Sequence, residues 1–419
     1  MIRTRSGYTL LLYALLPRAL WHLLWRARRQ PAYLRRIPER FGYYRQRSAA
    51  PLIWIHAVSV GETRAAEPLI RALQKEYPGR RILLTHMTPT GWESGEALFG
   101  DTVSRCYLPY DFPGAIARFL DRFRPCMGLV METELWPNLI HACRERTVPL
   151  YVVNARLSAK SYARYRRFPE LTRASLGELT AVAAQTADDA QRLTALGARN
   201  ITVTGNLKFD IAPPTAQLAL GRSWRESYGP GRPVLLAAST REGEEQMLLA
   251  HFHELDRETS SVLLIIVPRH PQRFDEVAAL IEHSGLRYQR RSGNAIIDPQ
   301  TQVLLGDSMG ELFAYYAACD VAFIGGSLLP FGGQNMIEAC AAGKPVLFGP
   351  HTYNFSEAAE GAVATGAALR VATAAELMRE GRLLLLEDAG AARRMGEAGL
   401  AFVTAHQGAT QRVLNLVRF

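Results

Sequence analysis

Short apolar runs alternate with helix-length segments over most of the chain that follows Pro51. The runs lack the strict apolar and polar alternation of half-exposed strands, so they are typical of parallel strands buried on both faces. Between the first two runs, residues 62–77 carry apolar side chains at helical spacing, and Pro78-Gly79 ends that pattern. This alternation predicts a doubly wound parallel sheet. The runs in this part of the chain are LIWIHAV, RILLTHM, CMGLVME, VPLYVVN, TAVAAQT and ITVTGNL.

The pattern breaks between residues 210 and 231, where Pro213-Pro214 and YGPGRP intervene, and then begins again with PVLLAAS, SVLLIIVP, TQVLLGD, VAFIGGS and PVLFGP. At 419 residues the chain also exceeds what one core usually organises. We therefore predict two Rossmann-like α/β domains, residues 48–211 and 212–419, that face one another across a cleft. Ligands of open α/β sheets bind at the carboxyl ends of the strands, so candidate chemistry is sought there.

The first 47 residues differ from the rest of the chain. They hold eleven arginines, no lysine and one acidic residue, which accounts for the whole formal net charge of +10. Their most apolar stretch, residues 8–25, would reach about 27 Å as a helix, against a hydrocarbon core of about 30 Å. Pro17 and Arg18 weaken a membrane span, and a helix lying in the interface suits the residues at least as well. We predict a membrane-associating segment over residues 1–47; the alternative is an amphipathic helix packed on the domain itself.

Charge and cysteine usage exclude several classes of function. Beyond residue 47, 38 basic and 38 acidic residues balance, whereas a nucleic-acid reader would carry its basic stripe on the folded domain, so we expect no nucleic-acid partner. The five cysteines are scattered without a CxxC pair, which indicates neither a disulfide framework nor a zinc site. The chain also lacks GxxxxGK[ST] and GxGxxG loops, a D-x-D pair at a strand end and a histidine cluster. We expect chemistry that needs no metal and no cofactor.

Strand ends in the first half carry candidate catalytic side chains. Glu62 follows Gly61 at or next to a helix start, where an ionised carboxylate is favoured and could act as a general base; ordinary helix capping is the alternative. Glu132 and Glu134 directly follow a buried strand, where carboxylates are costly unless they are solvated, paired or hydrogen-bonded. Lys208 could offset the charge of a phosphate or carboxylate, or be a solvated surface group.

Strand ends in the second half predict a nucleotide site. The guanidinium fork of Arg269 suits phosphate oxygens, although a surface ion pair is the alternative. Residues 306–311 turn from strand to helix, and backbone N–H groups at such a turn can hold an anion. The glycines of GGS and GGQNMIE let the backbone approach a ligand closely. Asn335 and Glu338 have capping-box spacing, and Glu338 could also accept hydrogen bonds from ribose hydroxyls.

Nine motifs in a fixed order resemble one known family. They are HAVSVGET, MTPTG, METELWPN, NARLS, TGNLKFD, PRHPQRF, GDSMGEL, GGSL and GGQNMIEA, after an apolar, arginine-rich N-terminus. Together they closely resemble the Kdo transferases of Gram-negative bacteria, which transfer 3-deoxy-D-manno-octulosonic acid (Kdo) from CMP-Kdo to the lipid A precursor. The resemblance covers nearly the whole chain. One departure is the sequence SLLPFGGQN at residues 327–335, where many relatives carry a loop of the SLV-x-x-GGHN type.

The resemblance implies a GT-B fold in which the first domain holds the acceptor, the second holds the nucleotide, and the last helix packs back on the first domain. It implies that Glu62 is the general base of an inverting transfer and that Glu132 and Lys208 stabilise the transition state. The residues implied to bind CMP are Pro268, Arg269, Met309, Gly310, Glu311, Asn335, Met336, Ile337 and Glu338.

The resemblance also implies where the protein works and on what. The donor would be CMP-Kdo, which is cytosolic, and the acceptor the bisphosphorylated lipid A precursor (lipid IVA), so the expected location is the cytoplasmic face of the bacterial inner membrane. Two alternatives stay open, because fold alone does not determine function. One is a nucleotide-sugar epimerase of the same architecture, and the other is a non-enzymatic lipid-binding or scaffold protein.

Overall fold

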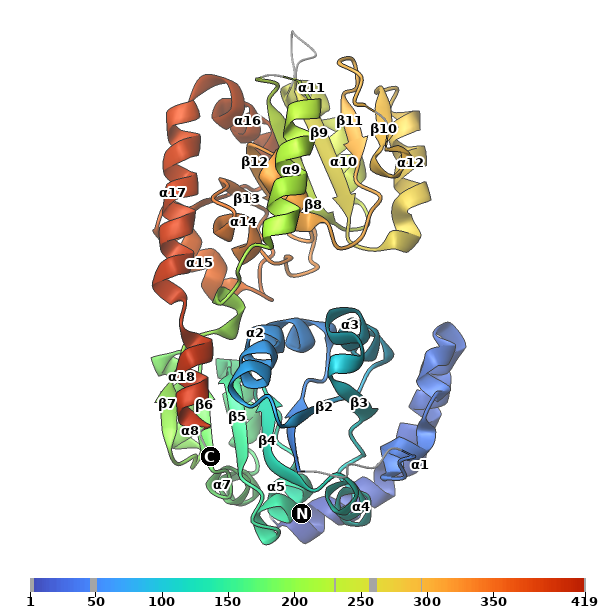
Figure 1. The fold of residues 1–419 in the computed structure, drawn as a ribbon, viewed down its shortest axis with the longest axis vertical. Helices are drawn as coiled ribbons and strands as arrows, with labels where there is room; N and C mark the ends of the chain where they lie inside the picture. Colours follow the sequence, from blue (N-terminus) through green and yellow to red (C-terminus); the bar gives the residue numbers. More distant parts are fainter. Residues whose placement is uncertain (1–3, 46–50, 230, 256–261, 295, 418–419) are drawn as a thin grey trace. The chain divides into compact units, whose positions relative to one another are not determined.

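The computed structural model describes residues 4–45, 51–229, 231–255, 262–294 and 296–417 (Figure 1). The chain divides into two compact units, each with one parallel sheet. Unit 1 comprises the chain up to Asp210 together with residues 406–419, and unit 2 comprises residues 211–405. The expected boundary between residues 47 and 48 lies outside the described residues. The predicted fold class, two Rossmann-like parallel-sheet domains, is confirmed.

The sheet of unit 1 has the strand order β3-β2-β1-β4-β5-β6-β7, with every pair parallel. This is the order of the Rossmann fold with one further edge strand. Each of the six predicted runs contains a strand, whereas β3 was missed because its four residues, SRCY, do not form an apolar run. The strands are β1 (Leu52–His56), β2 (Arg81–His86), β3 (Ser104–Tyr107), β4 (Pro125–Met131), β5 (Leu150–Ala155), β6 (Ala181–Ala184) and β7 (Ile201–Val203).

Central strand β1 is buried on both faces, which is why its sequence shows no polar alternation. Ile53 packs with Leu69 of α2 in the core on one face. On the other face, the Trp54 ring meets Phe119 of α4 edge-on, with ring centroids 5.2 Å apart. Gly128 of β4 makes room for this tryptophan, because a Cβ there would lie 2.6 Å from Trp54 Cε3. The helices are α1 (Arg5–Arg29), α2 (Val60–Glu76), α3 (Pro89–Phe99), α4 (Pro113–Phe123), α5 (Pro137–Glu145), α6 (Ala159–Tyr165), α7 (Pro169–Gly177) and α8 (Ala187–Ala195).

The last helix, α18 (Ala409–Leu416), also belongs to unit 1, where it lies against α2 and β6 (Figure 1). Val413 is fully buried in the same core as Leu69. The Asp210 carboxylate accepts hydrogen bonds from the backbone N–H groups of Gly408 and Thr410, at the start of the helix. Two chain segments that are 200 residues apart are thereby joined within one unit.

Helix α1 packs on unit 1 through its first half, and Leu23 and Ala27 in its second half are also buried. Thr9 Oγ1 donates a hydrogen bond to Asn138 Oδ1 of α5 at 3.0 Å, and the Tyr13 ring lies 4.7 Å from that of Phe112. Several apolar side chains of the helix nevertheless remain exposed, among them Leu10, Trp21 and Leu24 at 72%, 66% and 57%. Among the described helices, none combines the length and the hydropathy that crossing a bilayer requires.

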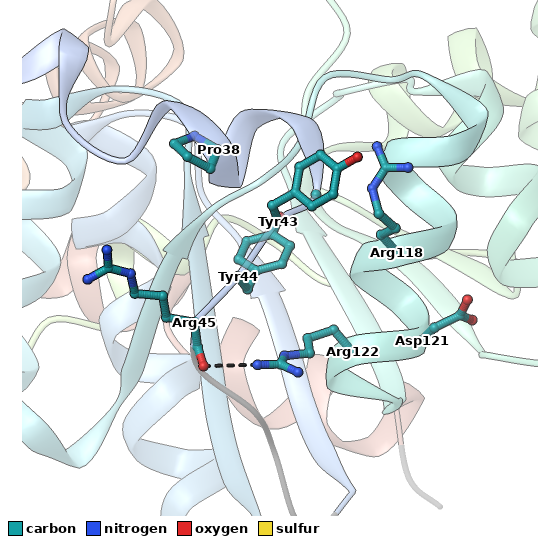
Figure 2. Close-up of a pocket in the computed structure, with 8 residues that line it drawn as sticks. Pro38, Tyr43, Tyr44, Arg45, Arg118, Asp121 and Arg122 are labelled. Atoms are coloured by element: carbon teal, nitrogen blue, oxygen red, sulfur yellow. Dashed lines mark hydrogen bonds between the residues drawn. The ribbon is translucent and has the colours of Figure 1, made fainter.

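The chain returns from α1 to the sheet through η1 (Pro31–Leu34) and η2 (Ile37–Phe41), and two arginines of α4 hold it there. Arg118 donates two hydrogen bonds to the carbonyl oxygen of Phe41. Arg122 donates one to the carbonyl oxygen of Arg45 at 2.9 Å (Figure 2). They line an open hollow of about 510 Å³. Because this end of α4 leads into the amino end of β4, the hollow lies away from the strand ends where ligands are expected.

The sheet of unit 2 has the strand order β10-β11-β9-β8-β12-β13-β14, also entirely parallel. Without edge strand β10, the order repeats that of the first six strands of unit 1. The five predicted runs all contain strands, but β10 and β14 were missed because their sequences, YQR and ALR, contain charged or polar residues and form no apolar run. The strands are β8 (Val234–Thr240), β9 (Leu263–Pro268), β10 (Tyr288–Arg290), β11 (Val303–Leu305), β12 (Val321–Ile324), β13 (Val346–Phe348) and β14 (Ala368–Arg370).

The helices of unit 2 follow its strands in the same alternation. They are α9 (Thr215–Ser227), α10 (Glu244–Ala250), α11 (Phe252–Leu255), α12 (Phe274–His283), α13 (Leu312–Ala318), α14 (Ile337–Ala341), α15 (Ser356–Ala364), α16 (Ala374–Arg382) and α17 (Ala389–His406).

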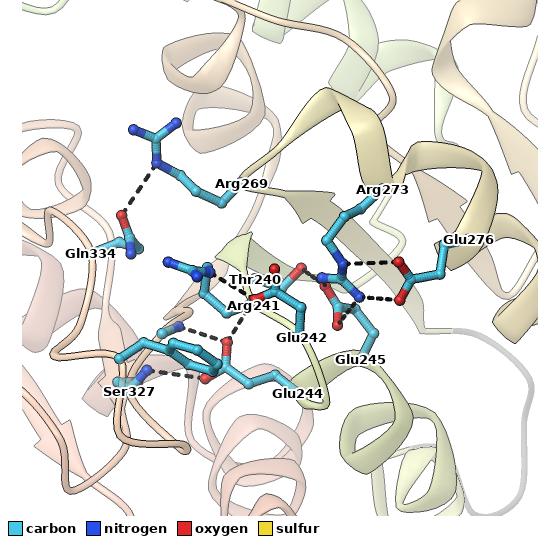
Figure 3. A network of polar contacts seen from close by, with 12 residues as sticks. Thr240, Arg241, Glu242, Glu244, Glu245, Arg269, Arg273, Glu276, Ser327 and Gln334 are labelled. Atoms are coloured by element: carbon cyan, nitrogen blue, oxygen red, sulfur yellow. Dashed lines mark hydrogen bonds and ion pairs between the residues drawn. The ribbon is translucent and has the colours of Figure 1, made fainter. Parts of the chain in front are cut away.

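A buried carboxylate fixes the glycine-rich loop of unit 2. Glu244, at the start of α10, is fully buried, and its two oxygens accept hydrogen bonds from the backbone N–H groups of Arg241, Gly326, Ser327 and Leu328 at 2.6 to 3.0 Å (Figure 3). Burial raises the pKa of Glu244, and these four donors oppose that effect. Gly326 has a φ of +68°, a conformation that suits glycine. The loop after β12 is thus held by the helix after β8.

Replacing Glu244 by Gln should loosen this loop. An amide has one acceptor oxygen, and its NH2 group would face backbone donors, so part of the charge-assisted network is lost. We expect hydrogen exchange over residues 325–328 to become roughly 10- to 100-fold faster, as hydrogen bonds to charged groups of about 1.5 to 3 kcal/mol are removed. Mass spectrometry of exchanging peptides measures this. The exposed neighbour Glu242→Gln is the control, and equal protection in both variants would contradict the prediction.

Candidate active site

Glu62 lies in the first turn of α2, directly after central strand β1. Its Oε2 accepts a hydrogen bond from the Val58 backbone N–H at 2.7 Å, and its Oε1 accepts one from Ser59 Oγ at 3.0 Å. Ser59 in turn caps the helix by accepting from the Glu62 N–H. The capping interpretation of Glu62 is therefore correct as geometry, and the side chain is only 8% exposed.

Burial decides the protonation of this carboxyl group. It raises the pKa of Glu62 to about 7, because loss of solvent disfavours the charged form more than the Val58 and Ser59 hydrogen bonds favour it. The negative charges of Glu132 and Glu134 raise the pKa further. A group that is half ionised near pH 7 can both accept and release a proton there, which is what a general base requires.

Glu132 and Lys208 come together at the same sheet edge. Glu132 follows β4 in a left-handed conformation, with φ of +57°, and its backbone N–H donates to Val153 of β5. Its Oε1 lies 3.7 Å from Lys208 Nζ. The structure therefore joins two of the sequence-predicted residues in an ion pair, and it places the Glu132 charge close enough to affect Glu62.

Glu134 is a member of this cluster to which sequence analysis assigned no role. Its carboxylate accepts a hydrogen bond from Trp136 Nε1 at 3.2 Å. Burial raises the pKa of Glu134, and the charge of Glu132 adds to the effect. The sequence contains a reason to consider Glu134, because it is two residues beyond Glu132 after the same buried strand. Only the structure shows that the charges of both residues raise the pKa of Glu62.

Asn154, at the end of β5, is a second residue without an assigned role. It is fully buried with φ of +55°, and its Oδ1 accepts from the Leu207 backbone N–H at 3.0 Å. This bond fixes the short helix η4 (Leu207–Phe209) and with it Lys208. The position could have been suspected from a polar residue at the end of an apolar run.

Two histidines lie beneath this edge, and neither is protonated near neutral pH. Burial lowers the pKa of His56 to about 3 and that of His86 to about 4. Their ring nitrogens face backbone oxygens of Thr85 and Ala57, respectively. Of these three groups, only Glu62 changes its charge near pH 7.

In unit 2, Pro268 ends β9 and Arg269 follows it. The Arg269 backbone N–H donates to Thr240 at the end of β8, and its Nε donates to Gln334 Oε1 at 3.3 Å (Figure 3). Gln334 stands in the loop that the Glu244 carboxylate holds, since its backbone N–H donates to Gly325. Arg269 is thus brought to the glycine-rich loop, as a phosphate-binding arginine would need to be.

The turn after β11 carries Met309, Gly310 and Glu311. Met309 is 54% exposed, and Gly310 has φ of +80°. The Gly310 carbonyl accepts from Gln217 of α9 at 2.7 Å, and Glu311 pairs with Arg291 at 3.3 Å. This turn therefore lies at the carboxyl end of β11, next in the sheet to β9 and its Arg269.

Asn335 and Glu338 interact, but not as the capping box that their spacing suggested. Asn335 Oδ1 accepts from the Ile337 backbone N–H at 3.1 Å, and its Nδ2 donates to Glu338 Oε1 at 3.0 Å. The Glu338 carboxylate thus holds the Asn335 side chain. The side chains of Met336 and Ile337 are buried in the core, so these two residues can contact a ligand only through the backbone. The described residues contain no cluster of His, Cys, Asp or Glu that could hold a metal ion.

Solved structures of low sequence identity share this fold. UDP-GlcNAc 2-epimerase from Neisseria meningitidis is 16% identical with a TM-score of 0.58, covering 87% of this chain and 99% of that one. A glycosyltransferase from Rickettsia africae is 14% identical with a TM-score of 0.58, covering 88% and 98%. Both likenesses concern the two-domain GT-B architecture and not the chemistry.

Sequence relatives are far more similar. The family model described as 3-deoxy-D-manno-octulosonic-acid transferase (kdotransferase) matches residues 35–211. The 3-deoxy-D-manno-octulosonic acid transferase of Bordetella pertussis is 47% identical, covering 98% of both chains. The protein of the same description from Haemophilus influenzae is 40% identical, covering 99% of this chain and 98% of the relative. These identities extend over nearly the whole length, through both units and both groups of candidate residues, and the chain therefore belongs to the Kdo transferase family.

Proposed function

We propose that this Kdo transferase moves Kdo from CMP-Kdo to a hydroxyl group of the lipid A precursor, with inversion and with Glu62 as the general base. The observation that carries the proposal is a buried carboxyl group with a pKa of about 7 at the carboxyl end of β1. The acceptor oxygen attacks the anomeric carbon of Kdo, its proton passes to Glu62, and the bond from that carbon to the CMP phosphate oxygen breaks. CMP then leaves with the electron pair of that bond.

In this proposal the other strand-end residues have distinct roles. Glu132 and Lys208 stabilise the transition state, since a carboxylate and an ammonium group 3.7 Å apart can balance positive charge on the sugar ring and negative charge on a leaving phosphate. Pro268, Arg269, Met309, Gly310, Glu311 and residues 335–338 bind CMP. The glycine-rich loop that Glu244 holds in place would let the backbone approach the nucleotide closely.

Replacing Glu62 by Gln should abolish transfer while the protein still binds CMP. A general base contributes about 10²- to 10⁴-fold to the rate, and an amide of the same shape cannot accept the proton. Mass spectrometry of the acceptor after incubation with CMP-Kdo counts the Kdo units added, and calorimetry measures CMP binding. Glu76→Gln, at the exposed far end of α2, is the matched control. Full activity of the Glu62 variant would rule out this base, and an unmodified acceptor with wild-type enzyme would rule out the reaction.

The pH dependence of transfer should report the same group. The base must be ionised, and its pKa of about 7 means that kcat/KM should fall roughly tenfold for each pH unit well below 7 and level off above it. Because the negative charge of Glu134 raises the pKa of Glu62, Glu134→Gln should shift this acid limb to lower pH. Initial rates at limiting acceptor concentration, measured between pH 5 and 9, give kcat/KM as a function of pH. This interval extends about two pH units on either side of the pKa. An unshifted limb in Glu134→Gln would show that another group controls it.

We further propose that α1 attaches the protein to the cytoplasmic face of the inner membrane, where CMP-Kdo and the lipid acceptor meet. Changing Leu10, Trp21 and Leu24 together to Gln should reduce binding to vesicles containing anionic phospholipid by at least about tenfold, because exposed apolar side chains supply the interfacial affinity. Flotation measures this binding. A matched control changes three exposed apolar residues of unit 2, namely Ile296, Leu386 and Leu400. Equal flotation of all three proteins would contradict the proposal.

A further inference from the structure

The segment after β5 is strongly basic. Residues 156–167 contain Arg156, Lys160, Arg164, Arg166 and Arg167 and no acidic residue. Four of these, Lys160, Arg164, Arg166 and Arg167, are exposed, and together they form what is called here the α6 basic face. In the part of the chain that the structure describes, no acidic side chain forms an ion pair with any of the four.

Two tyrosines lie beside this face, with the guanidinium groups of Arg164 and Arg166 at 5.9 and 5.7 Å from the ring centroids of Tyr165 and Tyr162. Tyr162 and Tyr165, three residues apart, pack against the core of unit 1. Within α6, Lys160 and Arg164 are four residues apart and project on the opposite side, and Arg166 and Arg167 follow in the turn after the helix. Like charges at this spacing destabilise a helix when nothing neutralises them. Repulsion between these positive charges therefore lowers the stability of the free protein. A bound anion would remove that repulsion, which would explain why the charges are clustered.

The α6 basic face is tied to the loop that carries the strand-end carboxylates. Tyr165 Oη donates to the Thr133 carbonyl at 3.4 Å, and Thr133 Oγ1 donates to the Arg156 carbonyl at 2.6 Å. Thr133 stands between Glu132 and Glu134, and the positive charge of Arg164 lowers the pKa of Glu134 against the effect of burial. The basic side chains therefore lie beside the reacting edge of the sheet, not at a distant surface.

The two arginines of α4 do not offer the same chemistry. Arg118 and Arg122, in the hollow of Figure 2, donate hydrogen bonds to the backbone carbonyls of Phe41 and Arg45. Their guanidinium groups hold the chain between α1 and β1 in place. The donors of the α6 basic face are not occupied in this way.

We propose that the α6 basic face binds a phosphate group of the lipid acceptor and so positions the attacking hydroxyl group over Glu62. This inference rests on the proposed function and adds to it the residues that read the acceptor. Guanidinium groups bind phosphate oxygens in a bidentate manner, and an ammonium group adds a compact charge, so Arg164, Arg167 and Lys160 together suit a phosphomonoester dianion. They are binding and positioning residues, since the proton transfer remains with Glu62.

The test compares two acceptors in neutral detergent micelles without anionic phospholipid. One is the bisphosphorylated lipid A precursor, and the other is the same lipid after enzymatic removal of its phosphates. The triple variant Lys160→Gln, Arg164→Gln, Arg167→Gln should raise KM for the phosphorylated acceptor about tenfold and change kcat by less than about twofold, as expected for lost charge-assisted binding. On the dephosphorylated acceptor, the variant and the wild type should have the same KM.

Two control variants separate charge from position and from folding. Lys75→Gln, Arg144→Gln, Arg199→Gln removes three exposed charges of unit 1 at the opposite edge of the sheet, in the last turns of α2 and α5 and after α8, and should leave KM unchanged. A charge-conserving variant, Arg164→Lys with Arg167→Lys, should keep KM within about threefold of the wild type, because the charge remains while the bidentate geometry is lost. Retained CMP binding by each variant shows that it is folded.

The outcomes are distinct. An active triple variant with unchanged KM for the phosphorylated acceptor overturns this inference alone. A defect that appears only after anionic phospholipid is added assigns the face to bilayer headgroups and also overturns it. A wild-type enzyme that modifies neither acceptor overturns the proposed function, and this inference with it.

Discussion

Burial of a glutamate at the carboxyl end of the first strand is the constraint on which each unit depends. In unit 1, Glu62 follows β1, and in unit 2, Glu244 follows β8; each of these strands is central in its sheet. Loss of solvent raises the pKa of both carboxyl groups, and backbone N–H donors oppose the rise. The two carboxyl groups differ in the number of their hydrogen-bond donors. Glu244 has four backbone donors, so it serves as an anchor for the loop at residues 325–328, whereas Glu62 has one backbone donor and one hydroxyl donor.

The same balance organises the charges around Glu62. Glu132 and Glu134 increase its affinity for a proton, and each has a partner of its own, Lys208 at 3.7 Å and Trp136 at 3.2 Å. The buried Asn154 side chain accepts a hydrogen bond from the Leu207 backbone N–H and fixes the backbone next to Lys208. Asn154 thereby determines the position of the Lys208 ammonium group. Farther along the edge, the α6 basic face adds positive charge, and none of its four side chains forms an ion pair with an acidic residue among those that the structure describes. Negative charge thus gathers where a proton is to be accepted, and positive charge where an anionic substrate is expected.

Part of the fold and of the candidate site could be predicted from the order of residues alone. The strands were predicted wherever the chain has an apolar run, and β3, β10 and β14 were missed because polar or charged residues in SRCY, YQR and ALR interrupt any such run. Strand-end reasoning found Glu62, Glu132, Lys208 and Arg269, since the carboxyl ends of parallel strands converge on one edge. It assigned no role to Glu134, Asn154 and Glu244, whose importance lies in contacts with residues from other strands. The capping-box interpretation of Asn335 and Glu338 identified an interacting pair but not its geometry, because spacing fixes which residues are neighbours and not which atoms bond.

The sequence by itself determined the number of domains, the parallel sheets, the concentration of positive charge in the first 47 residues and the motifs that indicate a Kdo transferase. These features depend on the local pattern of residues and on composition, which are the same in the folded and the unfolded chain. Only the tertiary structure decided that Asp210 joins segments 200 residues apart and that burial brings the pKa of Glu62 to about 7. Desolvation and charge coupling depend on which side chains from distant segments come within a few ångströms, roughly the range over which an unscreened charge shifts a pKa. Those distances cannot be obtained from the order of residues, because they are set only when the chain packs into its tertiary structure.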